Sequence, residues 1–163
     1  MMRKHTLATS FVLLIAVTVY GPAAMAAGGG GSDPVWPVAP EDANYTAGKQ
    51  SVEAMNWPAA LEAFEKAAAK DPGNANAQNY LGYVNRKMGK FDLAFKYYAE
   101  ALRLDPKHKG AHEYVGEAYL MVGNLPKAEE HLRALDGICF FSCEEFRDLK
   151  KAVAEYKDKN PGK

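Results

Sequence analysis

The chain has 163 residues, which is enough for one domain of ordinary size. It carries 20 basic and 20 acidic side chains, so its formal net charge is zero. A nucleic-acid-binding protein normally shows a basic patch, and nothing in this composition predicts such a partner.

Residues 1–26 have the pattern of a targeting segment. Arg3 and Lys4 give a positive start, the run from Thr6 to Tyr20 is mostly apolar, and Ala24-Met25-Ala26 offers the small residues that signal peptidase accepts. The alternative is an uncleaved membrane anchor, but the run is short for a bilayer span of about 20 residues. We therefore expect a cleaved signal peptide and a periplasmic or secreted bacterial protein without a stable membrane anchor. Its mature part would hold 18 basic and 20 acidic residues.

Residues 27–40 read as a flexible linker rich in glycine and proline. No core can be built from this stretch. Trp36 is the exception, because an indole is costly to leave in water. It either docks on the folded part of the chain or meets a partner, and the sequence leaves both options open.

The strongest signal is a set of landmarks that recur every 34 residues. They comprise Gly48, Gly82 and Gly116; Ala60, Ala94 and Ala128; Phe64, Tyr98 and Leu132; and the pairs Asp71-Pro72 and Asp105-Pro106. Between residues 91 and 102 the apolar side chains also follow the spacing of one helix face. A repeat of this length predicts one helix–turn–helix per unit.

These landmarks have physical reasons. A glycine in the first helix of a unit lets two helix backbones approach closely, and the ring of Phe64 or Tyr98 fills the gap beside it. A single hairpin cannot bury its apolar face alone, so the units must stack.

The pattern resembles that of a tetratricopeptide repeat (TPR) protein of the small, secreted bacterial type. The second repeat is the best copy, with the family's residues at Leu81, Gly82, Gly89, Phe91, Ala94, Tyr98, Ala101 and Pro106. The resemblance implies an all-α fold, an α-solenoid of three TPR helix hairpins over residues 41–136. The repeats are expected at residues 41–74, 75–108 and 109–136.

Residues 137–158 predict a turn and a helix that covers the end of the stack. Ser142 and Glu145 have the spacing of a capping box, so the helix is expected to begin at Cys143. Its apolar face would consist of Phe146, Leu149, Val153 and Tyr156. Residues 159–163 are expected to fray.

Cys139 and Cys143 are the only cysteines. An oxidising compartment and a short separation across a turn favour a disulfide that fixes the capping helix. The alternative is chemical: a thiol at a helix N-terminus can be reactive, and the pair could exchange disulfides or hold copper(I).

No pattern of catalytic residues is present. His108 and His112 have helical metal-ligand spacing, but the surrounding sequence does not match a known metal motif. The neighbouring carboxylates Glu129-Glu130 and Glu144-Glu145 read as solvated faces. We therefore expect no enzymatic activity, no catalytic residue, no cofactor and no metal site.

What remains is a binding surface. In TPR proteins the first helices of successive repeats line a concave groove, and the resemblance implies its positions here. They are Tyr45, Lys49, Asn79, Tyr83, Arg86, Lys87, Glu113, Glu117 and Leu120. Some family members bind a partner's terminal carboxylate with basic residues, but those of the third repeat are missing, since Gly110 and Tyr114 occupy the slots. Chaperone-tail binding is therefore not expected.

The leading hypothesis is an adaptor that binds a protein or peptide segment in its groove and performs no catalysis. One alternative is a periplasmic thiol-redox or copper-handling protein that uses Cys139 and Cys143. Another is a self-assembling scaffold, a homo-oligomer whose groove takes the Trp36 linker of a neighbouring copy.

Overall fold

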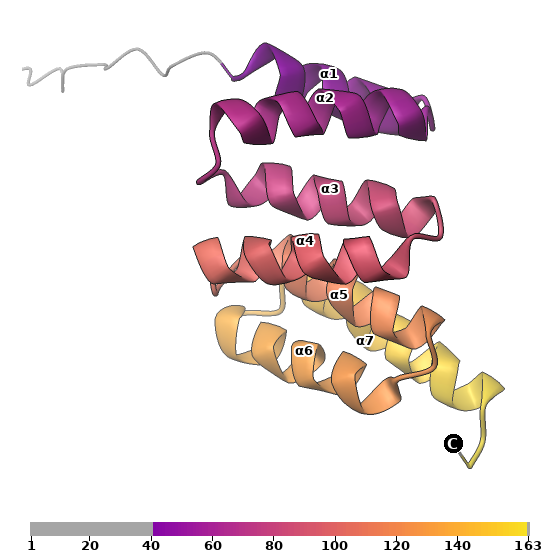
Figure 1. The fold of residues 1–163 in the computed structure, drawn as a ribbon. Helices are drawn as coiled ribbons and strands as arrows, with labels where there is room; N and C mark the ends of the chain where they lie inside the picture. Colours follow the sequence, from indigo (N-terminus) through magenta and orange to yellow (C-terminus); the bar gives the residue numbers. More distant parts are fainter. Residues whose placement is uncertain (1–40, 163) are drawn as a thin grey trace, which may run out of the picture. The chain divides into compact units, whose positions relative to one another are not determined.

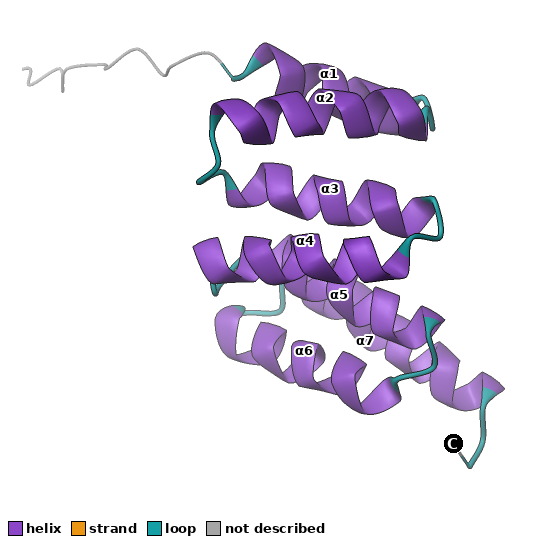
Figure 2. Ribbon diagram, viewed as in Figure 1, coloured by secondary structure: helices purple, strands orange, loops and turns teal. Residues whose placement is uncertain are grey.

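The computed structural model describes residues 41–162, and this part of the chain is built of helices and loops (Figure 2). The expected signal peptide at 1–26 and linker at 27–40 lie outside the described residues. The helices are α1 (Ala43–Glu53), α2 (Trp57–Lys70), α3 (Ala75–Lys87), α4 (Phe91–Leu104), α5 (Lys109–Met121), α6 (Leu125–Ile138) and α7 (Glu144–Lys159).

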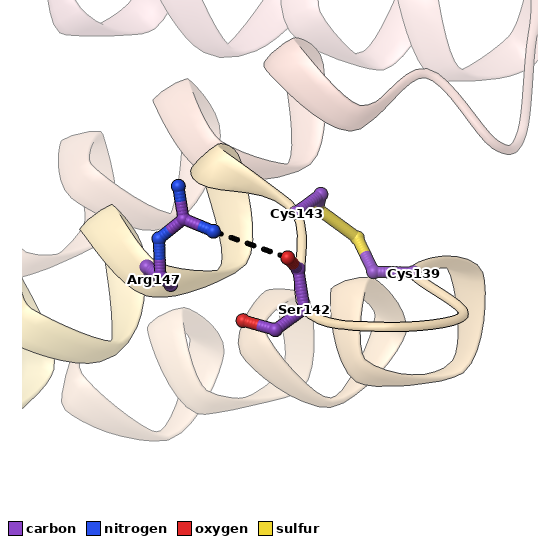
Figure 3. The surroundings of a disulfide bond; sticks show 4 residues. All are labelled: Cys139, Ser142, Cys143 and Arg147. Carbon is purple, nitrogen blue, oxygen red and sulfur yellow. Dashed lines mark hydrogen bonds between the residues drawn. A yellow bond between two sulfur atoms is a disulfide. The ribbon is translucent and has the colours of Figure 1, made fainter.

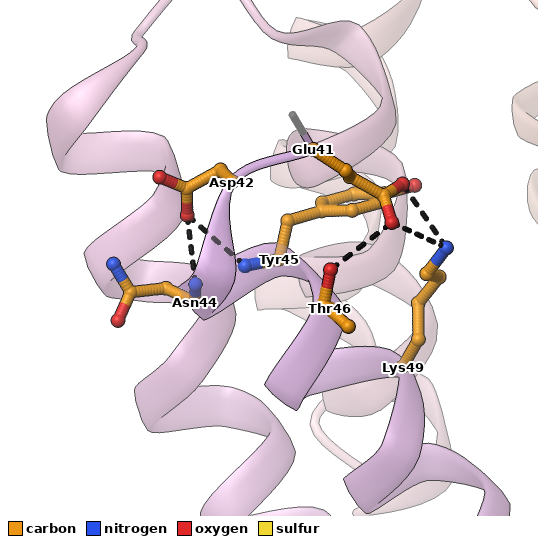
Figure 4. Close-up of polar contacts among 6 residues, drawn as sticks. All are labelled: Glu41, Asp42, Asn44, Tyr45, Thr46 and Lys49. Atoms are coloured by element: carbon orange, nitrogen blue, oxygen red, sulfur yellow. Dashed lines mark hydrogen bonds and ion pairs between the residues drawn. The ribbon is translucent and has the colours of Figure 1, made fainter. Parts of the chain in front are cut away.

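Most of these helices begin at a side chain that satisfies a free backbone N–H group. The Asp42 carboxylate accepts hydrogen bonds from the backbone N–H groups of Asn44 and Tyr45 at 2.9 and 3.1 Å (Figure 4). Asn56, Asn74 and Asn124 do the same for α2, α3 and α6. Such caps stabilise a helix by about 1 kcal/mol each, which explains why the boundaries follow the local sequence closely.

The two helices of each repeat are joined by a turn that needs a left-handed residue. Gly89 and Gly123 supply it with φ angles of 75° and 80°. In the first repeat the corresponding residue is Met55, with φ of 54°. A non-glycine residue there carries backbone strain, so the first turn is less well adapted to its conformation than the other two.

The hairpins α1–α2, α3–α4 and α5–α6 stack in order (Figure 1). Helices α2 and α3 pack together, as do α4 and α5, while α3 also contacts α5. Helix α7 packs against α5 and α6. The first helices of the repeats therefore form one row, and α7 extends that row beyond α5.

Glycines allow the close approach inside the first two repeats. A Cβ atom placed on Gly48 would lie 2.7 Å from the Phe64 ring, and one on Gly82 would lie 2.5 Å from the Tyr98 ring. The third repeat differs from this pattern. The space beside Gly116 is filled by Leu149 of α7, at 2.6 Å from such a Cβ atom.

Helix α7 covers the end of the stack with the expected apolar face. Leu149 and Val153 join Leu120, Ala128 and Leu135 in one buried cluster, and Phe146 and Tyr156 pack at its edge. The all-α solenoid with a capping helix is thus confirmed. Within residues 41–162, no helix is both long enough and apolar enough to cross a bilayer.

The predicted start of α7 is wrong. Ser142 is not the N-cap; it has a φ angle of 61°, and its carbonyl accepts a hydrogen bond from Arg147 Nη1 at 3.1 Å (Figure 3). The N-cap is Cys143, which makes no side-chain capping bond, and the helix begins at Glu144. The disulfide between Cys139 and Cys143 accounts for the difference, because it ties residue 143 to the end of α6 and leaves the turn no capping-box geometry.

Candidate partner-binding surface

The row formed by α1, α3, α5 and α7 carries a pocket of about 450 Å³, which we call the acidic pocket. Its walls are Tyr45, Asn76, Asn79, Tyr80, His108, Gly110, Glu113, Tyr114, Glu144, Glu145 and Asp148. All four helices contribute, together with the N-cap of α5. The pocket therefore depends on the stacking of the repeats and on the docking of α7.

At one end of this pocket, α1 brings an ion pair next to an aromatic ring. Lys49 Nζ lies 2.9 Å from the Glu41 carboxylate, which also accepts a hydrogen bond from the Thr46 hydroxyl (Figure 4). The Tyr45 ring packs edge-on against Phe64 and Tyr80. Lys49 is thus already neutralised by a neighbour, and Tyr45 is fixed in orientation.

Near the middle of the row, α3 holds a buried cation. Arg86 is only 7% exposed and lies 2.7 Å from the Glu117 carboxylate. Its guanidinium is 5.3 Å from the Tyr83 ring centroid and 5.6 Å from that of Tyr114. This arrangement places the positive charge inside the protein rather than on the surface.

Arg86 and Glu117 also line a second cavity, of about 380 Å³, between α5 and α7; we call it the α7 hollow. Its other walls are Leu120, Met121, Ala152, Glu155, Tyr156, Lys159 and Asn160. Leu120 is largely buried in the core beneath it.

The acidic pocket contains a strongly perturbed carboxyl group. Burial raises the pKa of Glu113 to about 8, and the negative charges of Glu117, Asp148 and Glu145 act in the same direction. Asn79 is 4% exposed, and its side-chain oxygen has no hydrogen-bond partner within the described residues. Burial also raises the pKa of Tyr114 to about 12.

The predicted groove residues do not form one continuous site. Tyr45, Asn79 and Glu113 line the acidic pocket, whereas Arg86, Glu117 and Leu120 line the α7 hollow. The other three, Lys49, Tyr83 and Lys87, line neither cavity. The Lys87 ammonium instead lies 5.5 Å from the Trp57 ring and 5.7 Å from that of Tyr83.

Sequence reasoning missed the contribution of α7 to this surface. Glu144 and Glu145 were expected on a solvated face, and the structure places both in the wall of the acidic pocket together with Asp148. The signal was the acidic start of α7, but only the docked position of this helix beside α5 shows which cavity these carboxylates face.

Two histidines of the third repeat lie in contact. His131 of α6 is half-buried, with its Nδ1 3.0 Å from Nδ1 of His112. His112 Nε2 is 3.1 Å from the Pro106 carbonyl, which can only accept, so His112 donates there and its Nδ1 accepts from His131. Burial, then the neighbouring His112, lowers the pKa of His131 to about 4.

The cysteines form a disulfide bond, with their Cα atoms 5.5 Å apart (Figure 3). Phe140 and Phe141 lie in the loop that it closes and are 90% and 88% exposed. Redox or copper chemistry at this pair stays a hypothesis. Across residues 41–162, no group of three or more His, Cys, Asp or Glu side chains is placed to hold a metal ion.

The family is decided by a sequence match over more than half of the chain. The profile described as "Tetratricopeptide repeat" matches residues 45–107 and again residues 86–139. The chain belongs to the tetratricopeptide repeat family. Members of this family are typically non-catalytic scaffolds for protein interactions.

Known TPR proteins resemble the chain over its folded part. It is 29% identical over 93 residues to the inactive TPR repeat-containing thioredoxin TTL3 of Arabidopsis thaliana, a match that covers 56% of this chain and 13% of that protein. The chain therefore spans only a small part of this relative's length.

Two solved structures show the same fold. The type III secretion translocator chaperone SycD of Yersinia enterocolitica aligns with a TM-score of 0.64 and 20% identity, over 71% of this chain and 82% of that one. The TPR2B domain of yeast Sti1, solved as a complex with pHsp70, aligns with a TM-score of 0.63 and 18% identity, over 71% and 94% of the two chains.

Proposed function

We propose that this TPR protein is an adaptor that binds a peptide or protein segment on the row formed by α1, α3, α5 and α7, without catalysing a reaction. The observation that carries the proposal is the acidic pocket, to which all four helices of the row contribute. A cavity shared by separate repeats suits an extended ligand that runs across them. The Sti1 domain with the same fold was solved as a complex with pHsp70, which supports a partner of this kind.

The chemistry of the surface argues against a partner that presents a terminal carboxylate here. The pocket is lined by Glu113, Glu144, Glu145 and Asp148 and by no lysine or arginine. A second carboxylate in such a place would be repelled. The acidic lining supports the expectation that chaperone tails are not the partner of this pocket.

The proposed place of action is the bacterial periplasm or the medium, reached through the predicted signal peptide at residues 1–26. Its support is the positive start, apolar run and cleavage pattern of that segment. Mass spectrometry of the exported protein tests this proposal by asking whether the chain begins at Ala27.

Peptide display on the full-length protein tests binding to the row. Peptides selected from a random library should bind saturably in calorimetry, and Asn76→Lys should weaken them at least ~10-fold because Asn76 is an exposed residue of α3 in the wall of the acidic pocket, where a longer side chain obstructs the ligand. Ala99→Lys, on the exposed face of α4, introduces the same side chain away from the row and should leave the affinity unchanged.

Two outcomes contradict the proposal. Either no peptide is selected above background, or the selected peptides respond equally to the change on α3 and to the control on α4. In the second case the ligand does not lie on the row.

A further inference from the structure

The acidic pocket gathers carboxyl groups that have no basic partner within the described residues. Glu113 of α5 and Glu144, Glu145 and Asp148 of α7 all line it. Within residues 41–162 none of these four carboxylates forms an ion pair or accepts a side-chain hydrogen bond, whereas Glu117 and Glu155 beside the α7 hollow have basic partners. This density of unpaired charge is costly unless something else compensates it.

Helix electrostatics explains only part of the cluster. Glu144 and Glu145 occupy the first turn of α7, where a helix N-terminus favours negative charge. Asp148 lies one turn further along, and Glu113 belongs to a different helix, so neither is explained in this way. Of the four carboxyl groups, the half-buried Glu113 is the least favourable to ionise, because it is kept away from water and lies close to other acidic groups.

A second, independent observation points to a ligand with hydrogen-bond donors. Asn79 lines the same pocket and is 4% exposed, yet its side-chain oxygen has no donor within the described part of the chain. A buried acceptor without a partner destabilises the folded protein. A donor-rich group in the pocket would satisfy this oxygen and pair with the carboxylates at the same time.

The remaining walls suit an organic cation. Tyr45, Tyr80 and Tyr114 line the pocket, and the faces of aromatic rings attract ammonium and guanidinium groups. The carboxylates surround a volume of about 450 Å³ rather than one point, and no trio of ligands in residues 41–162 is placed to hold a metal ion. A side-chain cation with its carbon stem fits such a space better than a bare ion.

The nearby basic side chains do not line the acidic pocket. Lys107 and Lys109 line an adjoining recess of about 250 Å³, which shares His108 and Glu145 with the pocket. Burial lowers the pKa of His108, so its ring is not a fixed positive charge at neutral pH.

We propose that the acidic pocket binds the ammonium or guanidinium group of a lysine or arginine side chain in the partner segment. The inference rests on the proposed function and adds the chemistry of the partner: Glu113 and Asp148 pair with the cation, Asn79 accepts a hydrogen bond from it, and the tyrosines enclose its stem.

The test is NMR titration of the full-length protein with small probes. Acetyl-arginine amide and acetyl-lysine amide should shift the backbone amide signals of Asn79, Gly110, Glu113 and Asp148 saturably. Acetyl-citrulline amide has nearly the same shape as the arginine probe but no charge, and it should cause at most a tenth of the effect at equal concentration. Calcium chloride controls for general attraction of cations, and glycinamide separates a chain-terminal ammonium from a side-chain cation.

Matched variants assign the binding to the pocket. Glu113→Gln and Asp148→Asn together should weaken the arginine probe at least ~10-fold, because one change removes a carboxylate that faces the cation and the other removes a carboxyl group that ionises when the cation binds. Glu65→Gln on α2 and Asp158→Asn on α7 change exposed carboxylates away from the pocket and should have no effect. The pocket variants remove repulsion between neighbouring carboxyl groups, so they should fold. Thermal unfolding of the variants checks this.

The inference is overturned if citrulline or calcium shifts these signals as strongly as arginine, if glycinamide binds as well as the side-chain probes, or if the pocket variants bind arginine normally. Its failure is separable from that of the proposed function. Every Lys and Arg of the display-selected peptides can be replaced by citrulline. If the peptides then still bind the row with the same affinity, the proposed adaptor function holds and the proposed cation site is wrong.

Discussion

Gly82 and Gly137 show how differently two glycines can contribute within one chain. At Gly82 a Cβ atom would lie 2.5 Å from the Tyr98 ring, closer than real side chains approach, and Tyr98 is fully buried. At Gly137, near the end of α6, nothing would lie within 4 Å of such an atom. The first glycine is required by packing, whereas the second only weakens its helix.

We therefore predict opposite effects of the same substitution. Gly82→Ala should lower the free energy of unfolding by about 1–3 kcal/mol, the usual cost of overpacking a tight core. Gly137→Ala should raise it by roughly 0.5 kcal/mol, because alanine loses less conformational entropy in a helix. Urea unfolding followed by circular dichroism measures both. A Gly82→Ala protein at least as stable as the wild type would mean that the α3–α4 contact is looser than described.

The histidine pair makes stability depend on pH. The pKa of His131 is about 4 in the folded protein, against an ordinary value of 6.5. Between these values the unfolded chain binds more protons than the folded one, so stability is full above pH 6.5 and is lost as the pH falls toward 4.

Replacing this histidine should remove that component. From pH 7 to pH 5 the wild-type protein should lose on the order of 1 kcal/mol at this site, allowing for the solvent that reaches part of the ring. The His131→Gln protein should lose less over the same range, although it is less stable at pH 7. Urea midpoints at the two pH values give the comparison, and parallel losses in both proteins would show that other groups dominate the acid response.

At the scale of the elements, α7 is held by two different means. Its apolar face, with Leu149 and Val153, packs into the cluster shared with α5 and α6. Its N-terminus is tied to the end of α6 by the disulfide, and Arg147 donates a hydrogen bond to the Ser142 carbonyl in the turn between the two helices. Packing positions the body of the helix, and the disulfide fixes the turn from which Glu144 and Glu145 enter the acidic pocket.

Removing the disulfide should loosen this turn without unfolding the repeats. For such a short loop, chain entropy predicts that Cys139→Ser with Cys143→Ser lowers the free energy of unfolding by about 2 kcal/mol. Hydrogen exchange should then accelerate in the first turns of α7 and stay unchanged in α3. Wild-type protein treated with a reductant is the control and should show the same acceleration of hydrogen exchange as the double variant. Equal exchange in the variant and the oxidised protein would mean that packing alone positions the turn.

The boundaries of most elements could be read from the sequence because their causes are local. Asn56, Asn74 and Asn124 cap the helices that follow them, and Gly89 and Gly123 allow the turns between the paired helices. The start of α7 could not be read in this way. Ser142 has the right neighbours for a cap, but the covalent link between residues 139 and 143 decides the backbone there.

At the scale of the described part of the chain, the repeat period was enough to predict the solenoid, since Gly48 and Gly82 have the same packing task and only the third repeat departs from it. The binding surface was harder to predict. Register placed Tyr45, Asn79 and Glu113 on the correct helices. It could not show that Arg86 is buried against Glu117 or that α7 supplies three of the four carboxyl groups of the acidic pocket. Both facts depend on contacts between elements far apart in the sequence, which no period records.

The leucine that α7 places beside Gly116 has a consequence for modularity. In the first two repeats the space next to the glycine is filled by a ring from the same repeat, Phe64 or Tyr98; in the third it is left for Leu149. Repeats of a solenoid are often interchangeable, but here the last repeat and the terminal helix must be exchanged as a pair. Moved onto the second repeat, α7 would find its place beside Gly82 already taken by Tyr98. Because α7 needs the free space beside Gly116, further repeats have to be inserted before the third repeat rather than between it and α7.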